Sequence, residues 1–168
     1  MASINITTLE THHDRETFDC NNDELNSFLR FNARANLKTG KSRTYVLTDE
    51  DSPSQILGYF TLLYTDLPVT NLPNGKLRGF SNNVPVILLG KLAISKDCQR
   101  QGFGHLAMNH IFRSSIDWHQ IAGGGGIIVD AKDTAAAKYY QDNFGFVPSP
   151  FEPLKLFLPM KTIIGSYK

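Results

Sequence analysis

The apolar run VILLGKLAI, at residues 86–94, constrains the fold of this chain more than any other feature. A strand with one face in water alternates apolar and polar side chains, whereas this run is nearly all apolar. Such a strand is covered on both faces and belongs at the centre of a sheet with other layers packed against it. The chain has 168 residues, 41% of them hydrophobic, which suits one sizeable core, so we expect a single domain over residues 1–168.

Strand and helix patterns alternate along the chain and predict an α/β fold with a mixed sheet. Strand patterns cover residues 3–9, 44–48, 56–64, 126–131 and 154–160, and a turn at 49–54 joins the second and third into a hairpin. Helical spacing of apolar residues covers 24–39, 102–118 and 133–143. Residues 67–85 are rich in proline and glycine, so we expect a mostly irregular surface segment there.

Composition excludes several classes of protein. A net charge of +1 with 41% hydrophobic residues argues against a disordered chain. No apolar run approaches the roughly 20 residues that a membrane helix needs. The first eight residues lack the pattern of an export signal, so we expect a cytoplasmic protein. Cys20 and Cys98 lie far apart without partners at metal spacing, which predicts free thiols and no metal site.

The segment QRQGFG, at residues 99–104, follows the central strand and opens the next predicted helix. A helix N-terminus exposes free N–H groups, and glycine lets the backbone approach a diphosphate closely. The spacing matches neither the nucleoside triphosphate loop nor G-x-G-x-x-G. Two interpretations stay open, a diphosphate-binding loop and a strand-to-helix turn whose glycines only permit tight packing.

Three segments in order resemble the GNAT family of acyl-CoA-dependent N-acetyltransferases: LLGKLAI (88–94), QRQGFG (99–104) and VDAKDTAAAKYYQDNFGF (129–146). The segments 18–47 and 154–162 are similar to a narrower branch, the TacT-like GNAT toxins of type II toxin–antitoxin pairs. The resemblance implies a GNAT fold, with a mixed, mostly antiparallel central sheet that is splayed at the acetyl-CoA site and flanked by helices. It also implies acetyl-CoA as the cofactor.

The same resemblance implies which residues bind acetyl-CoA. The backbone of the central strand would hold the pantetheine arm, at Leu92, Ala93 and Ile94. The amides of the following loop and helix start would hold the pyrophosphate, at Gln99, Arg100, Gln101, Gly102, Phe103, Gly104 and His105.

Tyr140 stands where the family places the tyrosine that protonates the leaving thiolate. Four residues separate Tyr140 from Gly145, whereas family members usually have three. Counting back from Gly145 would select Gln141, and Tyr139 is a further neighbour. The other interpretation is that both tyrosines only pack on the sheet.

No Asp, Glu or His has a spacing that makes it the general base. His105, His110 and His119 are candidates by residue type only and are more typical of a helix surface. An α-amine, with a pKa of about 7.7 to 8.0, is roughly a tenth to a sixth neutral at pH 7, against about one in 2,500 for lysine. A missing base therefore favours an α-amine as acceptor, such as that of the amino acid on charged tRNA.

Basic residues without an acid among them run from Arg30 to Arg43. They are Arg30, Arg34, Lys38, Lys41 and Arg43, and Arg78 and Lys91 would extend the patch. The first three recur every four residues and predict a stripe on one helix, while acids gather at 10–24 and 49–51. This separation suits a surface that follows RNA phosphates. An ordinary solvated helix face is the alternative.

The leading hypothesis is a toxin that acetylates the α-amine of aminoacyl-tRNA and stops translation. The resemblance also implies a ribbon-helix-helix antitoxin and a homodimer, with no membrane and no metal. Two alternatives stay open. One is a GNAT enzyme acting on a protein or small-molecule amine, and the other is an acyl-CoA-binding module without turnover.

Overall fold

The computed structural model describes residues 3–73 and 79–167. They form two compact units, one made of the chain up to Leu63 with Lys91–His110, the other of Tyr64–Gly90 with the chain from Ile111 onward. Three elements run through both units: β3 (Gly58–Pro68), β4 (Asn83–Ile94) and α3 (Phe103–Ala122). Within the described residues, seven strands form one sheet in the order β1-β2-β3-β4-β5-β7-β6, which confirms the predicted α/β class.

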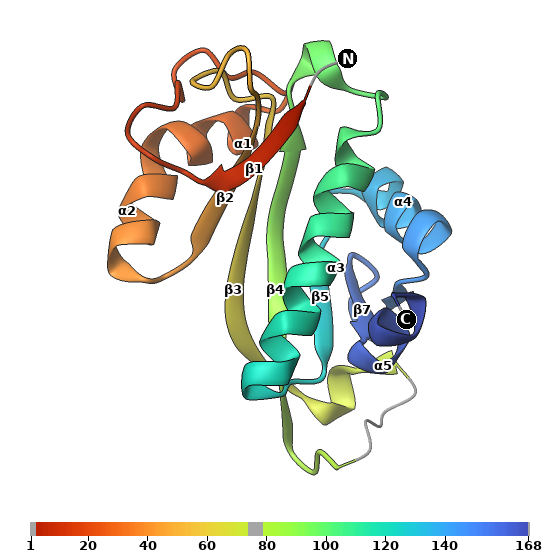
Figure 1. Cartoon of the computed structure of the whole chain (residues 1–168). Helices are drawn as coiled ribbons and strands as arrows, with labels where there is room; N and C mark the ends of the chain where they lie inside the picture. The colour runs from red at the N-terminus through yellow and green to blue at the C-terminus, as the bar shows by residue number, and fades with distance from the viewer. Residues whose placement is uncertain (1–2, 74–78, 168) are drawn as a thin grey trace. The chain divides into compact units, whose positions relative to one another are not determined.

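The first unit contains an antiparallel part of the sheet. Strand β1 (Ile4–Thr8) pairs with β2 (Arg43–Asp49), and β2 pairs with β3, so the predicted hairpin is confirmed. Figure 1 shows the short helices α1 (Asp23–Ser27) and α2 (Ala33–Thr39) beside β1 and β2. Their apolar stripe joins the unit's core, which includes Leu25, Leu29, Ala33, Tyr59 and Ala93.

The predicted helix over 24–39 contains a π-helical turn, η1 (Phe28–Asn32), between α1 and α2. Its predicted ends are confirmed, since the Asn22 side chain caps the first turn and Gly40, at φ 77°, ends the helix. A π turn holds one more residue than an α turn. The four-residue step from Arg30 to Arg34 is therefore not one α-helical turn, and the regular stripe predicted for the basic residues is wrong at this step.

The second unit contains the parallel pair of the sheet. Strand β4 pairs with β5 (Gly126–Asp130) only from Ile87↔Ile127 to Leu89↔Val129. Strand β5 then pairs antiparallel with β7 (Lys155–Pro159), and β7 with the short β6 (Val147–Pro148). Because β4 continues to Ile94, its last residues extend past its pairing with β5, as the expected splay requires.

The surface location expected for residues 67–85 is wrong for part of that segment. Strand β3 continues to Pro68, and the turn η2 (Val69–Asn71) carries Leu72 into the unit's core, where it is 1% exposed. Val84 at the start of β4 is buried in the same core. Prolines at strand ends and turns interrupt the pattern without preventing burial of the apolar residues between them.

The C-terminal part holds one predicted and one unpredicted helix. Helix α4 (Thr134–Phe144) begins where the Asp133 side chain accepts the N–H of Ala136 at 2.8 Å. Helix α5 (Met160–Ser166), drawn next to β7 in Figure 1, is too short for its periodicity to have been read from sequence. Among the described residues, no helix is long and apolar enough to cross a bilayer, and no three metal-ligating side chains gather together.

Candidate functional site

The loop between β4 and α3, residues 95–102, is called here the β4–α3 loop; it contains the short turn η4 (Lys96–Cys98). Arg100 (φ 63°) and Gly102 (φ 86°) are both in the left-handed region. Alternation of left-handed and ordinary conformations turns successive backbone N–H groups toward one side and makes an anion-binding concavity. The 20-residue helix α3 begins at the next residue and adds the positive end of its dipole.

Gly102 shows why glycine is needed here. A Cβ at this position would meet nothing within 4 Å, so the requirement is the positive φ rather than a lack of space. Open space above a set of backbone N–H groups suits a diphosphate. The residues of this loop therefore fit the diphosphate that the QRQGFG pattern predicts there.

The two glutamine side chains of the loop donate to backbone carbonyl oxygens of the protein itself. Gln99 Nε2 donates to the carbonyl oxygens of Ile94, at 2.9 Å, and Cys20, at 3.2 Å. Gln101 Nε2 donates to the carbonyl oxygen of Asp97 at 3.1 Å. These positions consequently offer a ligand their backbone N–H groups rather than their carboxamides. In the adjoining end of β4, Ala93 is buried in the core of the first unit, whereas Leu92 and Ile94 are half-buried.

Tyr140 lies in α4, in the second unit, and is buried. Its ring packs edge-on against Tyr139, at 5.5 Å between centroids, and against Phe146, at 5.7 Å. Burial, and secondarily Tyr139, raises the pKa of the Tyr140 phenol well above its ordinary value. Gln141, the alternative from counting, is exposed. Of the two positions, only Tyr140 combines a hydroxyl proton with a dry environment.

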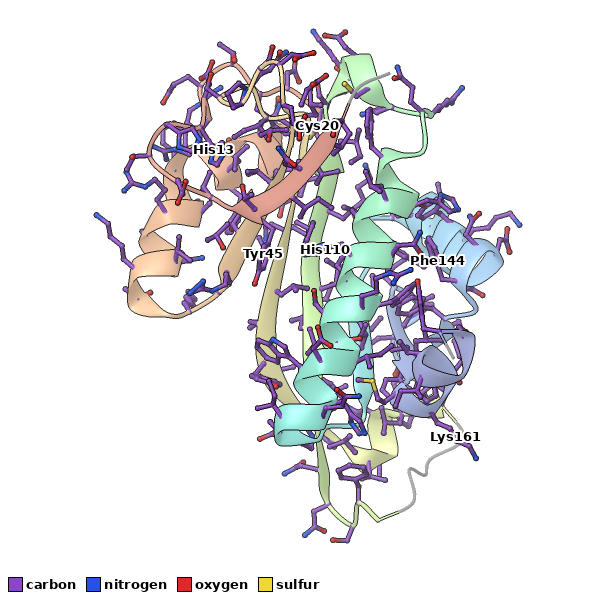
Figure 2. All side chains as sticks on the ribbon, viewed as in Figure 1. His13, Cys20, Tyr45, His110, Phe144 and Lys161 are labelled. Carbon is purple, nitrogen blue, oxygen red and sulfur yellow. The ribbon has the colours of Figure 1, made fainter. Side chains whose placement is uncertain are left out.

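Among the three histidine candidates, His110 differs from expectation. His105 is exposed, and His119 is half-buried with Nδ1 3.2 Å from the Gly124 oxygen. Figure 2 shows His110 beside Tyr45, and its ring centroid lies 6.3 Å from that of Tyr45 and 6.1 Å from that of Phe60. Burial lowers the pKa of His110, so its imidazole is neutral at pH 7.

His110 is therefore half-buried against two aromatic rings rather than fully exposed on the helix surface. The cause is the register of β2 with β3, which pairs Tyr45 with Phe60 and presents two stacked rings to the histidine. Helical spacing in the sequence identifies the helix but not the strand residues that it meets.

The basic residues of the first unit fall into separate groups. Arg30 Nη2 donates to the Glu16 carbonyl oxygen at 2.9 Å, and Arg30 Nε lies 3.6 Å from the Glu16 carboxylate. Arg34 and Lys38 instead line a shallow groove of about 410 Å³, called here the α2 groove, together with Leu9, Glu10, Thr11, His12 and Leu37. The expected separation of acids from bases holds along the sequence but not in space.

The remaining basic positions that the structure describes do not line the groove. Lys41 is exposed between α2 and β2, and Arg43 is exposed at the start of β2. Lys91 Nζ lies 4.4 Å above the ring centre of Phe28, a cation–π contact that no sequence signal indicated. Arg78 lies outside the described residues.

Comparisons with known proteins extend over nearly the whole chain. The model of the acetyltransferase (GNAT) family matches residues 7–146. A tRNA-acetylating toxin of Mycobacterium tuberculosis (strain ATCC 25618 / H37Rv) is 29% identical over 148 residues, which cover 88% of this chain and 87% of that protein.

Two solved structures share the fold along almost their full length. AtaT in complex with acetyl-methionyl-tRNAfMet has a TM-score of 0.90 and 27% identity, covering 99% of this chain and 100% of that one. A mutant AtaT toxin bound to the C-terminus of the antitoxin AtaR and to acetyl-CoA has a TM-score of 0.82 and 27% identity, covering 98% of each chain. The similarity therefore includes both units.

Proposed function

Because the chain belongs to the acetyltransferase (GNAT) family, we propose that it transfers an acetyl group from acetyl-CoA to the α-amine of the amino acid on charged tRNA. An acetylated amine no longer extends a peptide, so the product stops translation and the protein acts as a toxin. The observation that carries this proposal is the likeness, over 99% of the chain, to AtaT in complex with acetyl-methionyl-tRNAfMet. The tRNA-acetylating relative of M. tuberculosis agrees with it.

Acetyl-CoA supplies an activated acetyl thioester and a diphosphate by which it is held. We assign the diphosphate to the backbone N–H groups of residues 99–105, supported by the left-handed Arg100 and Gly102 and by the start of α3. We assign the pantetheine arm to the backbone of Leu92, Ala93 and Ile94, supported by the extension of β4 beyond its pairing with β5.

Tyr140 is the proposed general acid, giving its phenolic proton to the leaving thiolate. With ordinary pKa values near 10 and 8.5, this transfer is uphill by about 1.5 units, or roughly 2 kcal/mol. Burial raises the pKa of Tyr140, but a thiolate formed in a dry site is destabilised in the same sense. The transfer thus remains accessible within a catalysed step.

The acceptor amine explains why no general base is assigned. An α-amine is already partly neutral at pH 7, and ester attachment to tRNA withdraws electrons and lowers its pKa further. A lysine acceptor, by contrast, would require a base to remove its proton. The RNA is held by the basic side chains Arg30, Arg34, Lys38, Lys41, Arg43, Arg78 and Lys91 through contacts to phosphates.

Four further properties belong to this proposal. The toxin is neutralised by an antitoxin, which the complex of AtaT with the C-terminus of its antitoxin AtaR supports. We assign this antitoxin to the ribbon-helix-helix type and propose that the toxin works as a homodimer. It acts in the cytoplasm, where charged tRNA is found. The two units fold as one domain, because β3, β4 and α3 run through both. The single domain is tested by following unfolding with two different probes, which should report one and the same cooperative transition.

The decisive experiment supplies labelled acetyl-CoA with one of four acceptors: charged tRNA, uncharged tRNA, a lysine peptide or a free amino acid. We expect label only on charged tRNA, with mass analysis placing it on the α-amine. Label on the peptide or free amine alone would instead support an enzyme for those acceptors. Saturable acetyl-CoA binding without label on any acceptor would support a binding module.

A further inference from the structure

The segment Asp19–Asn26, which leads into α1, is held together by its own polar groups. The Asp19 carboxylate accepts the Asn26 side-chain amide at 3.0 Å and the Asn21 backbone N–H at 2.9 Å. The side-chain oxygen of Asn26, Oδ1, in turn accepts the backbone N–H of Cys20 at 3.0 Å. Asn21 has a φ of 64°, which an asparagine tolerates better than most residues. The segment is therefore a small, internally bonded turn.

This segment is joined to the β4–α3 loop at two places. The Lys96 backbone N–H donates to the Asp19 carbonyl oxygen at 2.8 Å, and its ammonium lies 3.4 Å from the Asp19 carboxylate. Gln99 Nε2 donates to the Cys20 carbonyl oxygen and, on the other side, to the carbonyl oxygen of Ile94 at the end of β4. Figure 2 marks Cys20 close to that end of β4.

We propose that Gln99 is a positioning residue for the acyl donor: its carboxamide ties the end of β4 to the Asp19–Asn26 segment and so holds the β4–α3 loop in its diphosphate-binding shape. A carboxamide has two N–H donors, and two carbonyl oxygens are present to accept them. The side chain is thus committed to the protein. The inference rests on the proposed function and deepens it, because the loop is the assigned diphosphate site.

Replacing Gln99 by methionine keeps the length of the side chain and removes both donors. Two partly exposed hydrogen bonds correspond to roughly a 5- to 20-fold change in an equilibrium constant. We expect the Kd for acetyl-CoA, measured by calorimetry, to rise by about that factor. The kcat at saturating acetyl-CoA stays within about threefold, because Gln99 does not touch the reacting atoms.

Gln101→Met is the matched control, since Gln101 is in the same loop and donates to only one carbonyl oxygen, that of Asp97. It loses one hydrogen bond within the loop rather than two to neighbouring segments, so we expect its Kd for acetyl-CoA to rise by only roughly 2- to 5-fold, less than that of Gln99→Met. Equal effects of the two methionine variants, or no effect of Gln99→Met, would overturn the proposal.

Gln99→Arg separates positioning from direct binding. A guanidinium still donates to both carbonyl oxygens but adds a positive charge. If the side chain positions the loop, the arginine variant binds acetyl-CoA with an affinity between those of the original protein and Gln99→Met. If the side chain touched the diphosphate, the added charge would make binding tighter than in the original protein, and the proposal would be wrong.

Amide hydrogen exchange of Lys96 tests the same contact without ligand or activity. Exchange at this amide should be faster in Gln99→Met than in the original protein, because the Lys96 N–H donates to Asp19 in the segment that Gln99 helps to hold in place. Exchange should be unchanged in Gln101→Met. Unchanged exchange in Gln99→Met would contradict the proposal. Failure to acetylate charged tRNA, with these affinity and exchange differences intact, would reject the proposed acceptor and leave the role of Gln99 standing.

Discussion

The β4–α3 loop and the basic helical segment from Asp23 to Thr39 belong to the same unit but carry their proposed roles in different ways. In the loop, the two glutamine carboxamides bind the protein's own carbonyl oxygens and the backbone N–H groups remain for the ligand. In the helical segment, the proposed binding of RNA depends on the positions of the charged side chains in the folded protein. The π turn η1 and the contact of Arg30 with Glu16 decide those positions.

This difference between the loop and the helical segment shows which kind of binding site can be predicted from a sequence. A backbone site needs a particular φ at a particular position, and a glycine marks it directly. A side-chain site needs neighbours, which come from distant parts of the chain. Tyr140 lies between the two cases, because its helix is readable from sequence but its burial against Phe146 is not.

The largest effect is expected at Tyr140, where a single hydroxyl carries the proposed chemistry. Tyr140→Phe should lower kcat by roughly 10²-fold or more while leaving the affinity for acetyl-CoA nearly unchanged. Steady-state kinetics and calorimetry measure the two quantities. Tyr139→Phe is the matched control and should retain most of its turnover. Full turnover in Tyr140→Phe would show that another group supplies the proton.

The next effect tests the backbone site. Gly102→Val forces a β-branched residue to a φ of 86° and should weaken acetyl-CoA binding by roughly 10- to 100-fold. Gly102→Asn should lose much less, because asparagine tolerates this conformation and a Cβ meets nothing within 4 Å. Isothermal calorimetry distinguishes the two variants. Equal losses would mean that added bulk, rather than φ, disrupts the site.

A smaller effect is expected from the α2 groove. Replacing Arg34 and Lys38 together by alanine should weaken tRNA binding by about tenfold and reduce the slope of log K against log salt by roughly 1.5 to 2. Arg30→Ala should change that slope less, since its guanidinium is already engaged by Glu16. Filter binding over a range of salt concentrations gives the slopes. Identical slopes for both variants would remove the distinction between the two groups.

The smallest expected effect is a dependence of stability on pH that comes from His13, which lies close in sequence to the residues of the α2 groove. Burial, and then the neighbouring His12, lowers the pKa of His13, whose Nδ1 accepts the Glu10 backbone N–H at 2.9 Å. The unfolded chain, with a pKa near 6.5, therefore takes up a proton first as the pH falls. The stability that this group contributes is complete above about pH 6.5 and is lost as the pH falls through the folded pKa.

Thermal unfolding between pH 7.5 and 5 measures this loss as a falling Tm. His13→Gln keeps an acceptor for the Glu10 N–H but does not titrate, so its Tm should fall less steeply over the same range. The same steepness in both proteins would assign the pH dependence to other groups, such as His110, whose pKa is also lowered by burial.

Much of the fold could be predicted because its signals are local. The capping oxygen of Asn22, the left-handed Gly40 and the hairpin of β2 with β3 each depend on a few adjacent residues. The burial of Leu72 and the helix α5 could not be predicted, since both depend on apolar residues meeting a core formed elsewhere in the chain. The same holds for the candidate site: its glycine-bearing loop could be predicted from local sequence, and its contacts between distant side chains could not.

The sequence by itself determined the central strand, the glycine-bearing loop that follows it and the helix that contains Tyr140. These depend on hydrophobic periodicity and on conformations that only certain residues adopt, and both act over short stretches of chain. Only the tertiary structure decided that Gln99 bonds to Cys20, that Arg30 meets Glu16 and that His110 packs on two rings. Hydrogen bonds, ion pairs and ring contacts act at a few ångströms, and folding alone brings residues far apart in the chain within that distance.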